Sequence, residues 1–127
     1  MPRLDMDGPF ELNADSIDAV VPKNIIGNYA LGNLSEDKKK FIVGYVGRSD
    51  SDLNERLKQH VGEYTHFKFS GATSVKEAFE KECHNYHDFT EGKTSQIHPA
   101  RPEGDDWQCP RCGVFRSNPP DRPDAST

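Results

Sequence analysis

Two segments rich in β-branched and aromatic residues, residues 25–34 and 40–48, dominate the first half of the chain. Five polar residues separate them, so the pattern predicts the two strands and the loop of an antiparallel hairpin. In the second segment Phe41, Val43 and Tyr45 alternate onto one face, as in a strand with one buried side.

Helical spacing follows this predicted hairpin. Residues 49–52 offer side chains that can cap a helix, and Leu53, Leu57 and Val61 then recur every four residues until Gly62. This pattern predicts a short amphipathic helix with one apolar stripe.

The next segments predict one more strand and one more helix. Residues 64–69 alternate, with Phe67 and Phe69 on one face. Residues 74–77 form a capping box that opens a helix extending to about residue 89. The expected fold class is α/β (α+β), a small, mostly antiparallel three-stranded sheet flanked by helices.

The ends of the chain carry weaker patterns than its centre. Residues 1–24 are acidic and predict an arm with little regular structure, in which only residues 17–21 are apolar enough to pack. We expect one domain over residues 25–90, an extension that packs on it over residues 91–115, and a disordered tail over residues 116–127.

Composition restricts the cellular setting and the partners. No apolar run approaches a membrane span, and the first ten residues carry acids where a signal peptide needs bases, so we expect a soluble, cytoplasmic protein and no membrane partner. The net charge of -5 weighs against nucleic acid as a partner. Residues 38–68, however, carry seven basic and four acidic side chains, which indicates either a nucleic-acid surface or an ordinary solvated face.

Glu82 is the first candidate functional residue, because it lies in the middle of an apolar helical stripe. The stripe is formed by Val75, Ala78, Phe79, Tyr86 and Phe89. A buried carboxylate must be paired, protonated or bound to a metal ion. A structural salt bridge is the simpler interpretation, and a metal site is the functional one.

Four further side chains are ambiguous when each is taken alone. Arg56 and His60 lie one turn apart at the edge of the first helix, where an arginine can clamp a phosphate or simply pair with a surface acid. Tyr29 and Tyr45 lie on the two strands of the hairpin, where tyrosines more often pack than react.

Taken in order, these segments resemble the GIY-YIG nuclease domain over residues 25–90. The resemblance is carried by Gly27-Asn28-Tyr29, by Gly44-Tyr45-Val46-Gly47-Arg48-Ser49, by residues 53–60 and by residues 77–82. The chain departs from the family at Asn28 and Val46, where isoleucines are usual, and neither position carries the chemistry.

The resemblance implies a metal-dependent endonuclease that cleaves DNA, with RNA as a possible substrate, to 5′-phosphate and 3′-hydroxyl ends. Glu82 would bind one Mg²⁺ or Mn²⁺ ion, and the other catalytic residues would be Tyr29, Tyr45, Arg56 and His60. The cations that would contact the nucleic acid are Arg48, Lys58 and Lys68. Independently of the resemblance, a domain this small offers few base-reading elements, so a homodimer or a partner protein is the expected source of specificity. The alternative is a non-catalytic binding module of the same fold, stabilised by zinc, that contacts nucleic acid or protein.

A second metal site is indicated by Cys109-Pro110-Arg111-Cys112-Gly113, since this tight turn aims two thiolates at one ion. We expect structural Zn²⁺, against a redox pair or incidental cysteines. Cys83 and His87, four residues apart on one helix face, are the first choice for the other two ligands, with His84 and His98 as substitutes. A buried core thiol is the alternative for Cys83.

Overall fold

The computed structural model describes residues 3–102 and 104–115, and its centre is a four-stranded antiparallel sheet in the order β1-β4-β2-β3. The sheet therefore has one strand more than the sequence predicts. In chain order the elements are β1 (Asp7–Glu11), α1 (Ala14–Val20), β2 (Gly27–Leu34), β3 (Phe41–Ser49), α2 (Leu53–Lys58), β4 (His66–Gly71), α3 (Val75–Asn85) and the π-helical turn η1 (Tyr86–Thr90).

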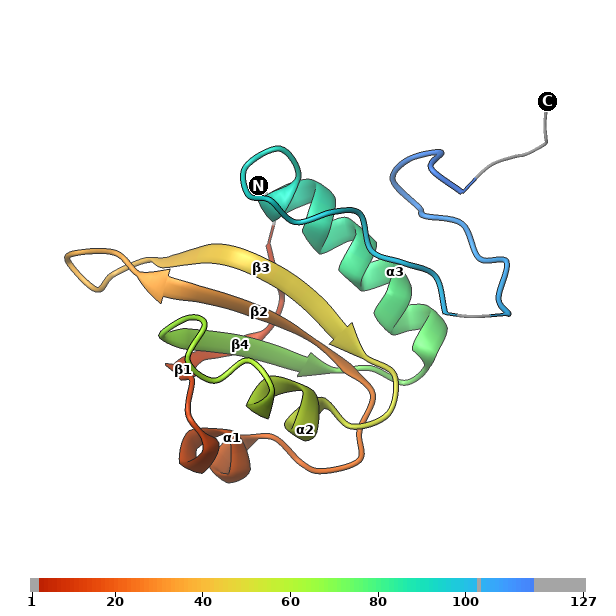
Figure 1. The fold of residues 1–127 in the computed structure, drawn as a ribbon. Helices are drawn as coiled ribbons and strands as arrows, with labels where there is room; N and C mark the ends of the chain where they lie inside the picture. Colours follow the sequence, from red (N-terminus) through yellow and green to blue (C-terminus); the bar gives the residue numbers. More distant parts are fainter. Residues whose placement is uncertain (1–2, 103, 116–127) are drawn as a thin grey trace.

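The helices cover opposite faces of the sheet. Helices α1 and α2 lie on one face and α3 lies on the other (Figure 1). The core under α1 and α2 contains Ile17, Leu57 and Phe67, each fully buried. The core under α3 and η1 contains Ala30 and Tyr86. Each face thus has its own apolar layer, as expected when a sheet is covered on both sides.

The extra strand corrects the expectation for the N-terminal arm. β1 pairs with the edge of β4, and the ring of Phe10 lies 5.6 Å from that of Phe67. Helix α1 begins after Asn13, whose side chain accepts the Ser16 amide at 2.8 Å. The segment is therefore part of the domain. Its five-residue strand is largely exposed and contains a proline, so it lacks the alternation that identifies a strand.

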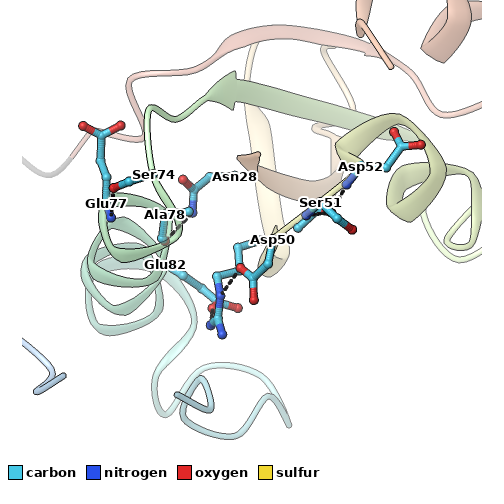
Figure 2. Close-up of polar contacts among 10 residues, drawn as sticks. Asn28, Asp50, Ser51, Asp52, Ser74, Glu77, Ala78 and Glu82 are labelled. Carbon is cyan, nitrogen blue, oxygen red and sulfur yellow. Dashed lines mark hydrogen bonds and ion pairs between the residues drawn. The ribbon is translucent and has the colours of Figure 1, made fainter. Parts of the chain in front are cut away.

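The hairpin and the two later helices form where the sequence predicts them. β2 and β3 pair along their lengths, with Tyr29 opposite Gly47. The side chain of Ser74 accepts the Glu77 amide at the start of α3 (Figure 2). Helix α2 ends at Lys58, so Val61 lies outside it and is 44% exposed rather than part of the apolar stripe.

The extension after η1 contains no strand or α-helix among its described residues. It packs against α3 through a cluster in which Phe79 and Cys83 contact Cys109, and the ring of Trp107 lies 6.2 Å from that of Phe79. The tail predicted for residues 116–127 lies outside the described residues. No helix in the described part of the chain is long and apolar enough to cross a membrane.

Candidate functional site

A chain of hydrogen bonds joins Tyr29, His60 and Glu63 beside the outer strand β3. The Tyr29 hydroxyl lies 2.9 Å from Nε2 of His60, and Nδ1 of His60 lies 2.9 Å from the carboxylate of Glu63. The Glu63 carboxylate can only accept a hydrogen bond, so it favours the tautomer of His60 that carries its proton on Nδ1 and accepts from the Tyr29 hydroxyl at Nε2. Tyr45 completes the group, with its ring centroid 6.2 Å from that of Tyr29.

The position of Tyr29 depends on Gly47, directly opposite it in the hairpin. A Cβ at Gly47 would lie 2.5 Å from the Tyr29 hydroxyl, so only glycine leaves room for the phenol. Burial raises the pKa of Tyr29 above its usual value, with the neighbouring Tyr45 acting in the same direction and Arg56 in the opposite one. The structure therefore holds Tyr29 as a neutral hydroxyl.

Glu82 lies on α3, and its side chain is only 9% exposed. Its carboxylate accepts a hydrogen bond from Nη1 of Arg48, with 2.5 Å between the nitrogen and the oxygen. Nε of the same guanidinium donates a hydrogen bond to the Asp50 carboxylate at 2.9 Å. Glu82 and Asp50 therefore lie on either side of one cation (Figure 2). Burial raises the pKa of Glu82 to about 7, although Arg48 acts in the opposite direction.

A buried amide fixes the part of α3 that carries Glu82. Nδ2 of Asn28, on β2, donates to the carbonyl oxygen of Ala78 at 2.9 Å (Figure 2). Asn28 is fully buried, and Ala78 lies one helical turn before Glu82. Asn28 thus ties the glutamate helix to the tyrosine strand.

Two adjoining pockets meet at Glu82. The arginine pocket has a volume of about 270 Å³ and is lined by Arg48, Asp50, Ser51, Arg56, Glu82 and Ala100. The tyrosine pocket has a volume of about 450 Å³ and lies between Gly44, Tyr45 and Tyr64 on one side and residues 94–100 on the other, with Glu82 also lining it. Tyr45, Arg56 and Glu82, from β3, α2 and α3, therefore line one continuous surface with a cationic part and an aromatic part. Tyr29, which is 1% exposed, and His60 line neither pocket.

A second cluster lies where the extension meets η1. Ligand atoms of His87, His98, Cys109 and Cys112 all lie within 4.8 Å of one another and could hold a metal ion. Nε2 of His87 lies 3.5 Å from Sγ of Cys109, and Nε2 of His98 lies 3.4 Å from Sγ of Cys112. Two ligands of a tetrahedral zinc ion are separated by about 3.6 Å, so these distances suit that geometry.

Cys83, the first choice from the sequence, lies outside this set, and His98 takes its place. Cys83 is fully buried beside Phe79, and burial raises the pKa of its thiol, which favours the neutral form. The Cys109 thiol has a lowered pKa instead. Burial opposes its ionisation, but hydrogen bonds from the Arg111 amide and from the two histidines lower the pKa to about 6. This favours the thiolate, which is the form that binds metals.

Two predicted nucleic-acid contacts lie away from these pockets. Nζ of Lys58 pairs with Asp18 of α1 at 2.7 Å. Lys68 lies over the ring of Phe41, at 5.6 Å from its centroid, and lines a different pocket. Of the three predicted cations, only Arg48 lies beside Glu82.

Sequence reasoning missed Glu63, Asp50 and Gln96. Glu63 is three residues after His60, a spacing that joins two side chains on one turn and could have suggested the pair. Asp50 was treated only as a helix-capping residue. Nothing in the local pattern marks Gln96, because its partner Val46 is fifty residues away.

Comparison with known proteins adds no family or relative, since no protein-family model, curated protein or solved structure matches the chain.

Proposed function

We propose that this chain is a metal-dependent endonuclease of the GIY-YIG type that hydrolyses phosphodiester bonds in DNA. The observation that carries the proposal is that Tyr45, Arg56 and Glu82 line one surface at the edge of β3, with the hydrogen-bonded pair of Tyr29 and His60 packed beside Tyr45. Spacing along the sequence alone does not require a strand tyrosine, a helical arginine and a glutamate from the opposite face of the sheet to converge.

In this proposal Tyr29 and His60 act together on the attacking water. A neutral phenol with a raised pKa is a poor base alone. Because Nε2 of His60 accepts the phenolic proton, Tyr29 can take a proton from water while passing its own to the imidazole. Glu63 stabilises the imidazolium that results, as a carboxylate does in other histidine relays.

Glu82 and the two arginines would act on the phosphate. Arg56, exposed in the arginine pocket, is positioned to neutralise charge that develops on the phosphoryl oxygens. A carboxylate of this kind suits one Mg²⁺ or Mn²⁺ ion whose other ligands are water and phosphate, and the ion would supply charge neutralisation there. For that, Arg48 must leave Glu82 and turn to the phosphate.

We propose zinc for the cluster of His87, His98, Cys109 and Cys112. Two thiolates and two imidazoles, all supplied by the protein, are typical of a closed structural zinc site. His87 is the second residue of η1, which continues directly from α3, so the ion would hold the extension against the helix that carries Glu82. The ion itself would take no part in the reaction.

The direct test is cleavage of plasmid DNA with Mg²⁺ or Mn²⁺ by the zinc-loaded protein and by Glu82→Gln. We expect nicking by the wild type and a loss of about 10²- to 10³-fold in the variant, because one carboxamide cannot replace the carboxylate. Glu80→Gln, on the same helix but away from both pockets, is the matched control and should cleave like the wild type. Equal nicking by wild type and Glu82→Gln, or nicking by neither, would contradict the proposal.

One observation favours a second candidate, a non-catalytic nucleic-acid-binding module of the same fold. The carboxylate of Glu82 is already paired with Arg48, as in a purely structural salt bridge. DNA binding without nicking by the wild type, under all divalent ions tried, would support this second candidate.

A further inference from the structure

In the proposed function hydrolysis would take place where the tyrosine pocket adjoins the arginine pocket, and the rest of the tyrosine pocket, between Tyr64 and residues 94–100, has no assigned role. The two pockets share Glu82 and Ala100. One offers Arg48 and Arg56 to an anion, and the other offers flat aromatic walls. A phosphate bound in the first would place the attached sugar and base beside the second.

The inner wall of the tyrosine pocket is aromatic. Tyr64 leans over Gly44, where any Cβ would overlap its ring, so the strand provides a smooth floor next to two phenol rings. Tyr45 and Tyr64 both remain partly exposed there. Rings in such positions stack on nucleobases, and this stacking does not depend on the base.

The outer wall is residues 94–100, which are anchored at two points. The side-chain amide of Gln96 donates to the Val46 carbonyl at 2.6 Å and accepts the Val46 amide at 3.0 Å. Two residues later, His98 joins the metal cluster. Thr94 and Ser95 add hydroxyl groups to the lining. The wall is therefore held by both the sheet and the candidate zinc site.

From these contacts we propose that the tyrosine pocket binds one unpaired nucleobase next to the phosphodiester that is cleaved. The inference rests on the proposed function and narrows its substrate to nucleic acid with an unpaired nucleotide, such as a bulge, flap or single strand. A volume of about 450 Å³ lies within the range of small-ligand sites. A base can enter a walled pocket only when it leaves the helical stack, which is least costly when it is already unpaired.

The test compares the affinity of the zinc-loaded protein for two duplexes that differ by one bulged nucleotide, measured by fluorescence anisotropy without added Mg²⁺. We expect the wild type to bind the bulged duplex roughly 5- to 100-fold more tightly, which is the range for stacking one base. Tyr64→Ala and Tyr64→Leu should lose this preference, while Tyr64→Phe should keep it because the ring is retained. Ile42→Ala, an exposed apolar residue of a different pocket, is the control and should keep it.

The outcomes separate this inference from the proposed function. Equal affinity for the two duplexes would overturn the base pocket, and so would a preference that survives in both Tyr64→Ala and Tyr64→Leu. If the protein nicks DNA but does not prefer the bulged duplex, the proposed nuclease function is supported and the base pocket is contradicted. If the preference for the bulged duplex depends on Tyr64 but no nicking occurs with Mg²⁺, the base pocket is supported and the nuclease function is contradicted.

Discussion

Gly47 illustrates how a residue without a side chain can control a reactive one. Its Cα faces the Tyr29 phenol, and a methyl group there would lie 2.5 Å from the hydroxyl. The ring must then move, and its hydrogen bond to His60 must lengthen or break. Displacements of this size, about 1 Å, cost roughly 100-fold in rate when they misplace a catalytic group.

We therefore expect Gly47→Ala to fold but to cleave DNA about 100-fold more slowly than the wild type, with a stability cost of about 1–3 kcal/mol from overpacking. Gly71→Ala is the matched control, because the nearest atom to its added Cβ, on Ile25, lies at an ordinary contact distance of 3.9 Å. Cleavage rates and thermal melting of both variants give the answer. A Gly47→Ala protein as active as Gly71→Ala would show that the phenol need not stay in place.

Single-residue roles were only partly predictable from the sequence. The apolar stripe around Glu82 correctly indicated a buried carboxylate. Its partner Arg48 is thirty-four residues away, so the ion pair depends on how the sheet and α3 pack, which no local pattern reports. The raised pKa of Tyr29 likewise follows from burial beneath neighbouring elements and not from its own segment.

At the scale of elements, η1 connects the candidate zinc site to α3. His87 lies in this π-helical turn, and π-helical turns are rare and often found at functional sites. Three other ligands come from the extension, which has no regular structure of its own. Apart from the candidate zinc site, the extension is held by the small cluster around Phe79, by the hydrogen bonds of Gln96 to Val46 and by the ion pair of Arg111 with Asp88.

We expect metal analysis to find one zinc per chain and chelation to lower the melting temperature by roughly 10 °C or more, since tight binding to the folded state alone contributes about 4 kcal/mol. His98→Ala should lose the ion and melt like the chelated protein. Cys83→Ala should keep the ion, because Cys83 lies outside the ligand set.

His84→Ala is the control for this comparison, since His84 is an exposed histidine of α3 that lines a separate pocket. Loss of zinc from Cys83→Ala with retention by His98→Ala would restore the ligand set expected from the sequence. If the wild type binds no metal, the proposed zinc site is wrong.

Elements with strong local signals were predictable, and those without were not. The hairpin, α2 and α3 have alternation, helical spacing and caps, so their positions follow from the sequence. The position of β1 depends on a tertiary contact, in which Phe10 packs against the rings of Phe67 and Phe69 on β4. His98 was only a substitute ligand because the loop that returns it to η1 has no periodicity.

At the scale of the whole molecule, the net charge of -5 implies weak attraction to nucleic acid in general. The basic side chains are also less concentrated than the sequence indicates, because Lys58 is paired with Asp18 and Lys68 lies over Phe41. Among the described residues, only Arg48 and Arg56 line the arginine pocket and are positioned for phosphates near Glu82.

We accordingly expect the affinity for DNA to fall only gently with salt, with a slope of log K against log salt of about -2 for two phosphates. Arg56→Ala should make this slope shallower by about one, because one phosphate contact is lost, whereas Lys58→Ala should leave the slope unchanged. Binding titrations at salt concentrations from about 50 to about 300 mM measure this slope. A Lys58→Ala effect equal to that of Arg56→Ala would mean that the contact surface extends over α2.

The side-chain amide of Gln96 has a consequence for solubility. β3 is the outermost strand on its side of the sheet, and such strands can add a strand from another molecule through their free backbone groups. Gln96 occupies the amide and the carbonyl of Val46 as a neighbouring strand would. Since the candidate zinc site holds the same segment, loss of the ion would expose a template for intermolecular β-pairing, so metal starvation would make the protein self-associate as well as lose stability.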